Sequence, residues 1–353
     1  MANPSVDAAR RFDTLPSIFQ RYRSPLRAAL RRSLASDTLP VYRMLRYSMG
    51  WNDADGKPIN ATEGKALRPT LCLFGCEATG GTIERGMPAA VALELIHHFS
   101  LIHDDIQDRD ETRHHRPTLW AMWGIPVALV AGNTMRVVAD RTLWQLVGNG
   151  VPHRAALQVA ALLTEAYLQM IEGQYLDLAY EGQPDISLDD YLGMISRKTG
   201  ALIRCSLHVG AVLGAQDDTT AAAFRECGRS LGYVFQIRDD VLGIWGDEKL
   251  TGKPVGADIR RKKNSLPIVY AMSRARGAEK EELMRIYKKE SPDSSDVDSV
   301  LGIMARLKTQ EYAQSLAAEN CERALGHIRD VALAPGFDSD INEVARFLLV
   351  RER

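Results

Sequence analysis

The chain has 353 residues, of which 45% are hydrophobic, and it carries 44 basic and 45 acidic side chains. This length and apolar content are enough for one large domain or two ordinary ones, each with a sizeable core. The net charge of -1 argues against a protein that binds nucleic acid through an overall basic surface, so we expect no nucleic-acid partner.

The five cysteines form no CxxC pair and no Cys/His spacing typical of a metal site. An odd number of cysteines without a secretory leader favours reduced thiols and a cytoplasmic location. No stretch reaches the ~20 consecutive apolar residues that a transmembrane helix needs, so we expect a soluble protein.

The apolar pattern is helical along nearly the whole chain. The longest segments, rich in Ala, Leu and Glu, are 83–105, 155–180 and 221–245. Glycine and proline gather at the joints between such segments. No low-complexity linker, repeat or composition break divides the chain. We therefore predict an all-α protein with a single domain over residues 1–353.

Two acidic steps end two of these long segments. In SLIHDDIQDRDETRHHRPT (100–118), Asp104 and Asp108 lie one helical turn apart, with Asp105 on a neighbouring strip. The order aliphatic, basic, Asp, Asp, aliphatic in IHDDIQ (102–107) returns in IRDDVL (237–242). In the second step, Gln236 precedes Asp240 by one turn.

Carboxylates that cluster without His or Cys suit hard cations, of which Mg²⁺ is the default. Mg²⁺ binds through one or two carboxylates and takes its remaining ligands from water and phosphate. A single acidic step is often only a solvated helix end, and Asp110 and Glu111 fit that explanation. Two matched steps, each after an apolar helix, favour a site for several Mg²⁺ ions and a polyphosphate.

Basic side chains that could bind a diphosphate also occur in short motifs. They are Lys65 and Arg68 in GKALRP, Arg113 after the first step, Lys198 in RKTG, Lys253 in LTGKPVG, and the run 260–263. A solvated helix face would explain any one of them alone, and the last run above all. Lys253, inside a Gly-Lys-Pro turn, is harder to explain in that way.

Taken together, these motifs resemble those of the trans-isoprenyl diphosphate synthases, or polyprenyl synthetases, of the geranylgeranyl and farnesyl diphosphate synthase type. The resemblance runs from about Gly64 to Pro267 and includes, in the family's order, GKALRP, HHFSLIHDDIQD, RPT, EGQYLDL, KTGAL, FQIRDDVLGIWGD, TGKPVGAD and KKNSLPI. It implies an isoprenoid synthase-type bundle of long helices around a central cavity, usually as a homodimer. It also implies a Mg²⁺-dependent prenyltransferase that condenses an allylic diphosphate with isopentenyl diphosphate and releases pyrophosphate.

The resemblance assigns roles residue by residue. Asp104, Asp105 and Asp108 would bind Mg²⁺ from one side, and Asp239 and Asp240 from the other. Arg113, Lys198 and Lys253 would hold the allylic diphosphate, and Lys65, Arg68 and His97 the isopentenyl diphosphate. Lys198, Thr199 and Gln236 would lie beside the reacting carbons, where their dipoles stabilise a carbocation. Taken alone, His97 on an apolar helix is more often a hydrogen-bonded core residue.

Three positions depart from the family pattern. His114 stands where a second arginine usually follows Arg113, Asn133 replaces an Asp, and Gly243 replaces the third carboxylate of the second step. His115 or Arg116 could replace the arginine, and Asp247 the carboxylate. Two alternatives follow: an enzyme that ionises allylic diphosphates without elongation, or a non-catalytic subunit of a heteromeric synthase. The many diphosphate-binding residues that are kept favour the synthase.

Product length in this family depends on the residues just before the first acidic step. Here they are Phe99 and Ser100, and an aromatic beside a small residue suggests a C20 product, with C15 as the alternative. Ser100 lies one turn from Asp104 on nearly the same strip. A helical wheel turns Phe99 well away from Asp104, so only the resemblance places Phe99 in the cavity. Met135 or Met170 could also open or close the tunnel.

Overall fold

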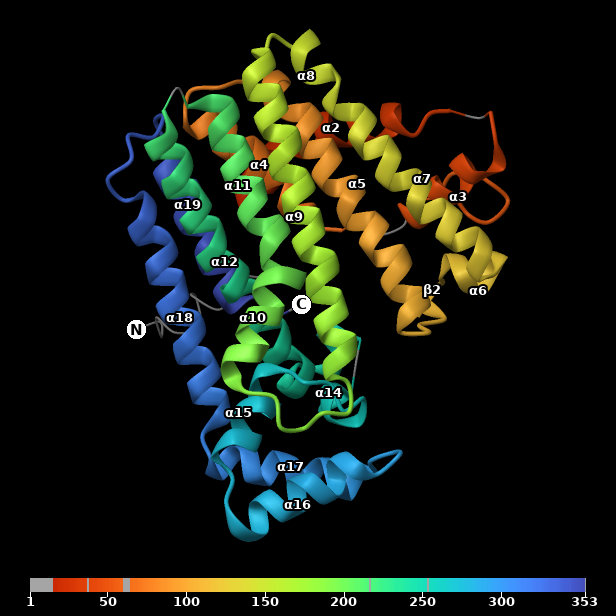
Figure 1. The fold of residues 1–353 in the computed structure, drawn as a ribbon, viewed down its shortest axis with the longest axis vertical. Coiled ribbons are helices and arrows are strands. Elements are labelled where there is room, and N and C mark those ends of the chain that lie inside the picture. Colours follow the sequence, from red (N-terminus) through yellow and green to blue (C-terminus); the bar gives the residue numbers. More distant parts are fainter. Residues whose placement is uncertain (1–14, 37, 60–63, 216, 253, 353) are drawn as a thin grey trace, which may run out of the picture.

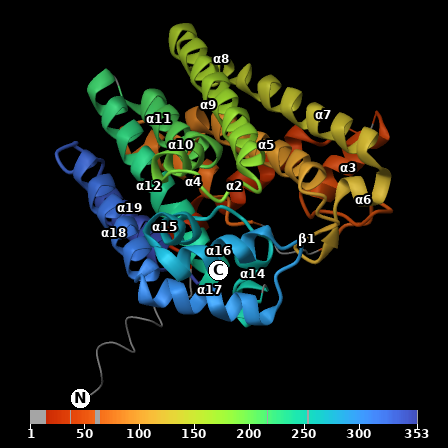
Figure 2. The ribbon, with the colours of Figure 1, turned by 60° about the horizontal axis from the view of Figure 1, so that its bottom comes forward.

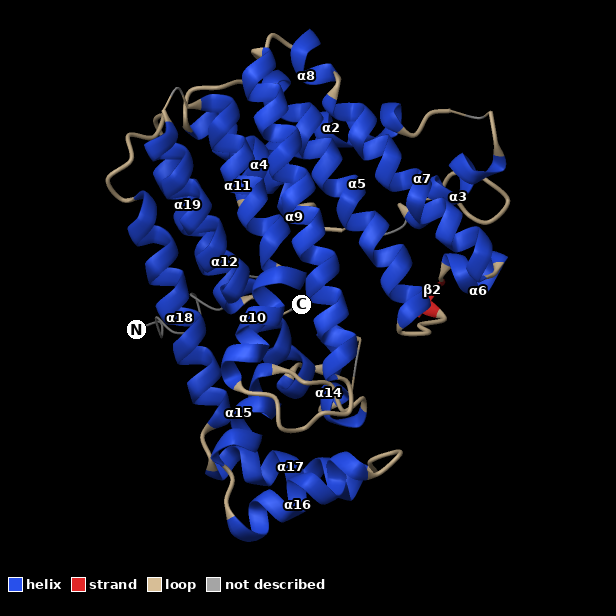
Figure 3. Cartoon of the chain, viewed as in Figure 1, coloured by secondary structure: helices blue, strands red, loops and turns tan. Residues whose placement is uncertain are grey.

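The computed structural model describes residues 15–36, 38–59, 64–215, 217–252 and 254–352. Its regular structure is almost entirely helical (Figure 3), which confirms the predicted all-α class. One small hairpin joins β1 (Thr112–Arg113) and β2 (Arg116–Pro117), which pair antiparallel. Among the described residues, no helix has both the length and the apolar composition needed to span a bilayer.

The helices follow one another along the chain. They are α2 (Ser17–Ser33), α3 (Pro40–Ser48), α4 (Leu67–Ala78), α5 (Ile83–Gln107), α6 (Leu119–Trp123), α7 (Ile125–Leu143), α8 (Gln145–Gly148), α9 (His153–Tyr180), α10 (Leu188–Lys198), α11 (Gly200–Gly214), α12 (Asp218–Trp245), α13 (Glu248–Thr251), α14 (Ala257–Arg260), α15 (Leu266–Arg274), α16 (Gly277–Lys288), α17 (Ser294–Arg306), α18 (Thr309–Ile328) and α19 (Phe337–Val350).

The three longest predicted segments are confirmed as α5, α9 and α12. Side chains that cap the first turn fix where two of them begin. Thr82 accepts a hydrogen bond from Arg85 N at the start of α5, and Asp217 accepts one from Thr220 N, at 2.7 Å, at the start of α12. The helices therefore begin where short polar residues satisfy otherwise unpaired backbone N–H groups.

Helix α11 is buried along most of its length because its sequence is almost wholly apolar, and it packs against α4, α9 and α12. Its contact with α4 is backbone to backbone. A Cβ added at Gly210 would lie 2.3 Å from the carbonyl oxygen of Cys72, so only glycine allows this approach. The α4–α11 pair is therefore held at a short, fixed separation.

The long helices run roughly alongside one another, and α16 and α17 lie across one end of the bundle (Figure 1). The carboxyl ends of α5 and α12 point towards that end, where α14 and the hairpin also lie. Figure 2 shows the same end turned towards the viewer. Both predicted acidic steps, at the ends of α5 and α12, therefore belong to one region of the molecule.

Candidate active site

The first acidic step closes α5. Asp108 is the residue after the last helical turn, and its N–H donates to the carbonyl oxygen of Asp104 at 2.8 Å. Burial raises the pKa of Asp104 to about 6; Lys198 opposes this rise and Asp108 adds to it. Burial also raises the pKa of Asp108, with Lys198 opposing and Asp177 adding. Negative charge is thus crowded at this step, and a further cation would stabilise it.

Asp105 differs from its two neighbours because it already has a cationic partner. Its carboxylate is buried and accepts a hydrogen bond from Arg113 Nε at 2.7 Å. The hairpin turns the chain so that Arg113 lies beside α5. The two residues of its turn, His114 and His115, have φ of 49° and 60°. Arg116 donates instead to the carbonyl oxygens of Tyr47 and Asn52, so it is fixed against the segment around α3.

Helix α9 adds an acidic residue that the sequence did not single out. Asp177 forms an ion pair with Lys198 at the end of α10. The backbones of α9 and α10 meet there, since a Cβ at Gly173 would lie 2.1 Å from Lys198 N. The segment EGQYLDL was recognised as a motif, but the pairing of its Asp with Lys198 depends on how α9 and α10 cross.

A chain of hydrogen bonds surrounds the second step. Thr199, at the junction of α10 and α11, donates through Oγ1 to Gln236 Oε1 at 2.6 Å. Gln236 Nε2 donates to Asp240 Oδ1 at 3.0 Å. Asp240 Oδ2 accepts from Leu266 N at 2.8 Å and from the hydroxyl of Tyr191. The structure therefore brings the predicted residues Thr199, Gln236 and Asp240 together.

The two aspartates of the second step have different surroundings. Asp240 is buried, and burial raises its pKa to about 6, opposed by Lys263 and by the hydrogen bonds to its carboxylate. Asp239 has a side chain that is 39% exposed, and it forms an ion pair with Arg351, just after α19. The carboxylate of Asp240 is thus fully hydrogen-bonded within the protein, whereas that of Asp239 is accessible to solvent.

Two side chains link the second acidic step to Asp177, the acidic neighbour of the first step. Lys263 interacts electrostatically with Asp177 and with both Asp239 and Asp240 of the second step. Burial raises the pKa of the Tyr191 phenol, and Asp240 and Asp177 add to the rise. The second step therefore lies within electrostatic reach of the residues that border the first.

No three His, Cys, Asp or Glu side chains within the described residues come close enough together to hold a metal ion by themselves. Mg²⁺ takes only one or two carboxylates and keeps its other positions for water and phosphate oxygens. Asp104 and Asp108 could together hold one such ion, and Asp239 could hold another.

A carboxylate from another helix lies beside Gly243, where the family pattern has an Asp. Asp258 of α14 is 8% exposed, and a Cβ at Gly243 would lie 2.2 Å from its Oδ2. Asp247 instead caps α13, accepting from Lys249 N at 2.8 Å. The position of Asp258 beside Gly243 was not predicted from the sequence, because it depends on the turn before α14.

Of the residues predicted to hold isopentenyl diphosphate, Arg68 and His97 lie close together. Arg68 is 9% exposed on α4; burial lowers its pKa, and Glu94 and Asp239 oppose the change. Burial also lowers the pKa of His97, and the charge of Arg68 adds to this, so the imidazole is neutral. Lys65 packs its Nζ 5.4 Å from the ring centre of Phe347.

Lys253 lies outside the described residues. Phe99 is 7% exposed, and its ring centre lies 4.6 Å from that of His103 and 6.2 Å from that of Tyr167 on α9. Ser100 Oγ donates to the carbonyl oxygen of His97 at 2.7 Å. Of the three departures, Asn133 is exposed on the outer face of α7.

Comparison with known proteins identifies the family and the fold. The sequence model of the polyprenyl synthetase family matches residues 56–304. A geranylgeranyl diphosphate synthase from Mycobacterium tuberculosis is 36% identical over 320 residues, which cover 90% of each chain. A (2E,6E)-farnesyl diphosphate synthase from the same species is 34% identical over 326 residues, covering 91% of this chain and 89% of the relative.

Among solved structures, a polyprenyl synthetase from Streptomyces coelicolor A3(2) superimposes with a TM-score of 0.87 at 34% identity. The match covers 95% of this chain and 99% of the other. The sequence match, the superposition and the order of the motifs all agree. The chain therefore belongs to the polyprenyl synthetase family.

Proposed function

We propose that the protein is a Mg²⁺-dependent prenyltransferase that condenses an allylic diphosphate with isopentenyl diphosphate. The product would be a C20 or C15 diphosphate, and pyrophosphate would be released. Relatives named as geranylgeranyl and farnesyl diphosphate synthases, at 36% and 34% identity, support this reaction class. The observation that carries the proposal is the electrostatic link that Lys263 and Tyr191 make between the second acidic step and Asp177, which borders the first.

The metal assignment follows from how each carboxylate is already engaged. The family is known to use a divalent metal. Asp104 and Asp108 would hold Mg²⁺ on one side and Asp239 on the other, and bound ions would neutralise the diphosphate and so weaken the allylic C–O bond. Asp105 would act through Arg113, which already bonds its Oδ1, and Asp240 through Gln236, because hydrogen bonds already occupy both oxygens of Asp240.

The basic residues divide between the two substrates. Arg113 and Lys198, which lie at the first step, would bind the allylic diphosphate, and Lys253 keeps the same assignment as a prediction from sequence. Lys65, Arg68 and His97 would bind isopentenyl diphosphate. A neutral His97 can donate one N–H to a phosphate oxygen without adding charge.

Thr199 and Gln236 would stabilise the positive charge that develops on the allylic carbon. The Thr199 hydroxyl donates a hydrogen bond to Gln236 Oε1, so the lone pairs of the hydroxyl oxygen are available to a cation. The amide of Gln236 is held in turn by Asp240. The departing pyrophosphate is basic enough to accept the proton lost from the elongated chain, so no protein general base is needed.

A homodimer is the assembly that we propose, and α9 carries the surface that supports it. Leu157, Leu168, Ile171 and Tyr175 are all exposed on α9 and recur at the spacing of one helix face. Val130 and Val137 of α7 are also exposed. Exposed apolar side chains gathered in this way are typical of a protein interface.

The test is incubation of the protein with Mg²⁺, labelled isopentenyl diphosphate and one starter at a time: dimethylallyl, geranyl or farnesyl diphosphate. Chromatography of the products gives their chain length, and light scattering gives the molar mass of the protein. A discrete C15 or C20 diphosphate supports the proposal. Pyrophosphate release without elongation would identify the ionising enzyme instead, and neither reaction would identify the non-catalytic subunit.

A further inference from the structure

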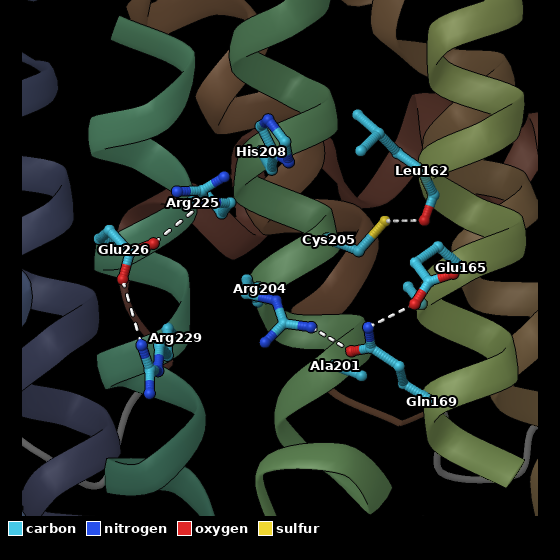
Figure 4. A pocket seen from close by; sticks show the side chains of 11 residues that line it. Leu162, Glu165, Gln169, Ala201, Arg204, Cys205, His208, Arg225, Glu226 and Arg229 are labelled. Carbon is cyan, nitrogen blue, oxygen red and sulfur yellow. Dashed lines mark hydrogen bonds and ion pairs between the residues drawn. The ribbon is translucent and has the colours of Figure 1, made fainter. Parts of the chain in front are cut away.

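A pocket of about 400 Å³ opens between α9, α11 and α12, away from the predicted site residues (Figure 4). Arg204 and His208 reach it from α11, Arg225 and Arg229 from α12, and Gln169 from α9. None of its lining residues belongs to the acidic steps or to the network around Gln236. Along α12, Gln236 is the seventh residue after Arg229, a rise of about 10 Å.

The basic groups of this pocket outnumber the acidic ones. Glu226 is shared between two arginines: it accepts from Arg225 Nε at 3.0 Å, and its other oxygen lies 3.7 Å from Arg229 Nη1. One carboxylate therefore serves two guanidinium groups, each of which has five N–H donors. Donors remain on the pocket side of α12 for a further acceptor.

Arg204 has a neutral partner rather than a carboxylate. Its Nη2 donates to the amide oxygen of Gln169, and Gln169 Nε2 donates in turn to Glu165 Oε1 at 2.6 Å. Gln169 therefore stands between Arg204 and the nearest carboxylate in this chain of hydrogen bonds, that of Glu165. The charge of Arg204 is left without a directly bonded counter-ion in the described contacts.

The electrostatic environment of the pocket is consistent with this count of charges. Burial, together with Arg225 and Arg204, lowers the pKa of His208 to about 4 against the effect of Glu226, so the imidazole is neutral. Burial also lowers the pKa of Arg204; Arg229 and Arg225 contribute through repulsion, and Cys205 and Glu226 oppose the change. An anion placed among these groups would relieve that repulsion.

The lining of the pocket also includes the apolar side chains of Leu162, Ala166 and Ala201. Its volume lies within the range of small-molecule sites, which is roughly 300–1,000 Å³. We infer that this pocket is a second ligand site, for a small phosphate or diphosphate ester whose anionic end meets Arg204, Arg225 and Arg229 and whose short apolar group contacts these apolar side chains. Arginine is the side chain best suited to two-pronged contact with phosphate oxygens. The inference goes beyond the proposed function and does not rest on it.

The experiment monitors the pocket itself, because the predicted active site would also bind diphosphates. The histidine ring Cε1–H signals are followed by NMR in EDTA, with the His208 signal assigned from a His208→Gln variant. Inorganic pyrophosphate, dimethylallyl diphosphate and sulfate are added separately at constant ionic strength. We expect both diphosphates to shift the His208 signal saturably, with dimethylallyl diphosphate the tighter, and sulfate to have little effect.

Two variants of α12 test the direction of the effect. Arg225→Gln with Arg229→Gln should weaken pyrophosphate binding at His208 by about tenfold or more, since two charged donors are lost. Glu226→Gln should tighten it, because the competing carboxylate is removed. Arg323→Gln, an exposed arginine paired with Glu319 on α18, is the matched control and should change nothing.

The inference is overturned if no added anion shifts the His208 signal, or if sulfate binds as well as pyrophosphate. It is also overturned if the double arginine variant, shown to be folded by circular dichroism, binds as tightly as the parent protein. Because no Mg²⁺ and no turnover are involved, failure here leaves the proposed prenyltransferase activity unaffected, and the reverse also holds.

Discussion

Arg351 forms an ion pair with Asp239, although the two residues are 112 positions apart. Arg351 is 5% exposed, and its guanidinium donates to the carbonyl oxygen of Phe235 at 3.1 Å and lies 4.4 Å from the ring centre of Phe235. Arg238 donates back to the carbonyl oxygen of Arg351 at 2.7 Å. The segment after α19 is therefore fastened to α12 at the residue that we propose as a metal ligand.

Arg351→Gln should lower turnover by roughly ten- to a hundredfold, because the carboxylate of Asp239 loses the contact that orients it. The free energy of unfolding should fall by about 1–3 kcal/mol, the cost of a lost buried charged hydrogen bond. Steady-state kinetics and urea unfolding measure the two effects. Arg346→Gln, at an exposed position on the preceding helix α19, is the control. Unchanged kinetics in Arg351→Gln would mean that Asp239 needs no such support.

Asp104→Asn should lower turnover by at least about a hundredfold while the helical content stays the same. The amide is nearly the same size, so the change removes charge without opening a cavity. Glu111→Gln, an exposed residue beyond the same step, should keep full activity. Circular dichroism and the product assay together separate loss of chemistry from loss of fold. A fully active Asp104→Asn would contradict the metal-site proposal.

The same variant should change how stability depends on pH. The pKa of Asp104 is raised from its usual 3.8 to about 6, so the folded protein binds more protons than the unfolded chain between these values. Stability is therefore highest below pH 4 with respect to this group, and it falls as pH rises through 6. Without divalent metal, Asp104→Asn should be more stable than the parent at pH 8, by roughly 1–3 kcal/mol.

That gain should shrink as the pH approaches 4, where the Asp104 carboxyl of the parent is protonated as well. Thermal or urea unfolding across this pH range in EDTA gives the curves. Asp240, whose pKa is also about 6, is common to both proteins and drops out of the difference. A stability difference that does not change with pH would mean that the Asp104 carboxyl titrates normally.

Gly243→Asp, which restores the family's usual residue, should weaken this protein. The new Cβ would lie 2.2 Å from Asp258 Oδ2 and would bring a second negative charge beside it. Overpacking of this kind costs about 1–3 kcal/mol. Adding Asp258→Gly should recover most of the lost stability, since it removes the obstructing carboxylate. A single variant as stable and active as the parent would contradict this account.

Helical glycines offer a matched control for that experiment. A Cβ at Gly302 of α17 would meet Arg306 Nη1 at 3.6 Å, an ordinary contact. Gly302→Ala should therefore be neutral or slightly stabilising, because alanine favours the helix by about 1 kcal/mol over glycine. Gly243→Ala should be destabilising by comparison, which separates the steric effect from the charge effect.

Two neighbouring substitutions test the prediction of product length. If Phe99 limits the chain, Phe99→Ala should lengthen the product by one or more five-carbon units. If Ser100 limits it, Ser100→Phe should shorten the product and Phe99→Ala should leave it unchanged. Chromatography of the products gives the answer, and circular dichroism checks the fold of Phe99→Ala, which loses a buried ring. Unchanged products in both variants would place the limit on another helix.

The long helices and the two acidic steps could be predicted from the sequence, because periodicity and one-turn spacing are local properties. The roles of neighbouring carboxylates could not. Asp239 and Asp240 are adjacent in the sequence, yet one reaches solvent and the other is bound by Gln236, Tyr191 and Leu266, which come from three helices. Such differences depend on tertiary packing, which spacing does not encode.

The same reason explains the residues that the sequence analysis missed. The crossing of α9 and α10 at Gly173 brings Asp177 beside Lys198, and the contact of α14 with α12 brings Asp258 beside Gly243. Arg351 lies outside the motifs altogether. The hairpin was also hard to predict, because its turn carries His114 and His115 where Asn and Gly are usual.

The backbone contact between α4 and α11 bears on how this fold can vary. Thr199 stands at the start of α11, and Gly210 of the same helix touches Cys72 of α4 with no side chain between them. Substitutions cannot easily change the distance between α4 and α11, so the position of Thr199 is set by a rigid framework. The rings and thioethers of Phe99, Met135 and Met170 lie on other helices, α5, α7 and α9. Under the proposed function, substitutions at these three positions could therefore change the chain length of the product while the position of Thr199 stays the same.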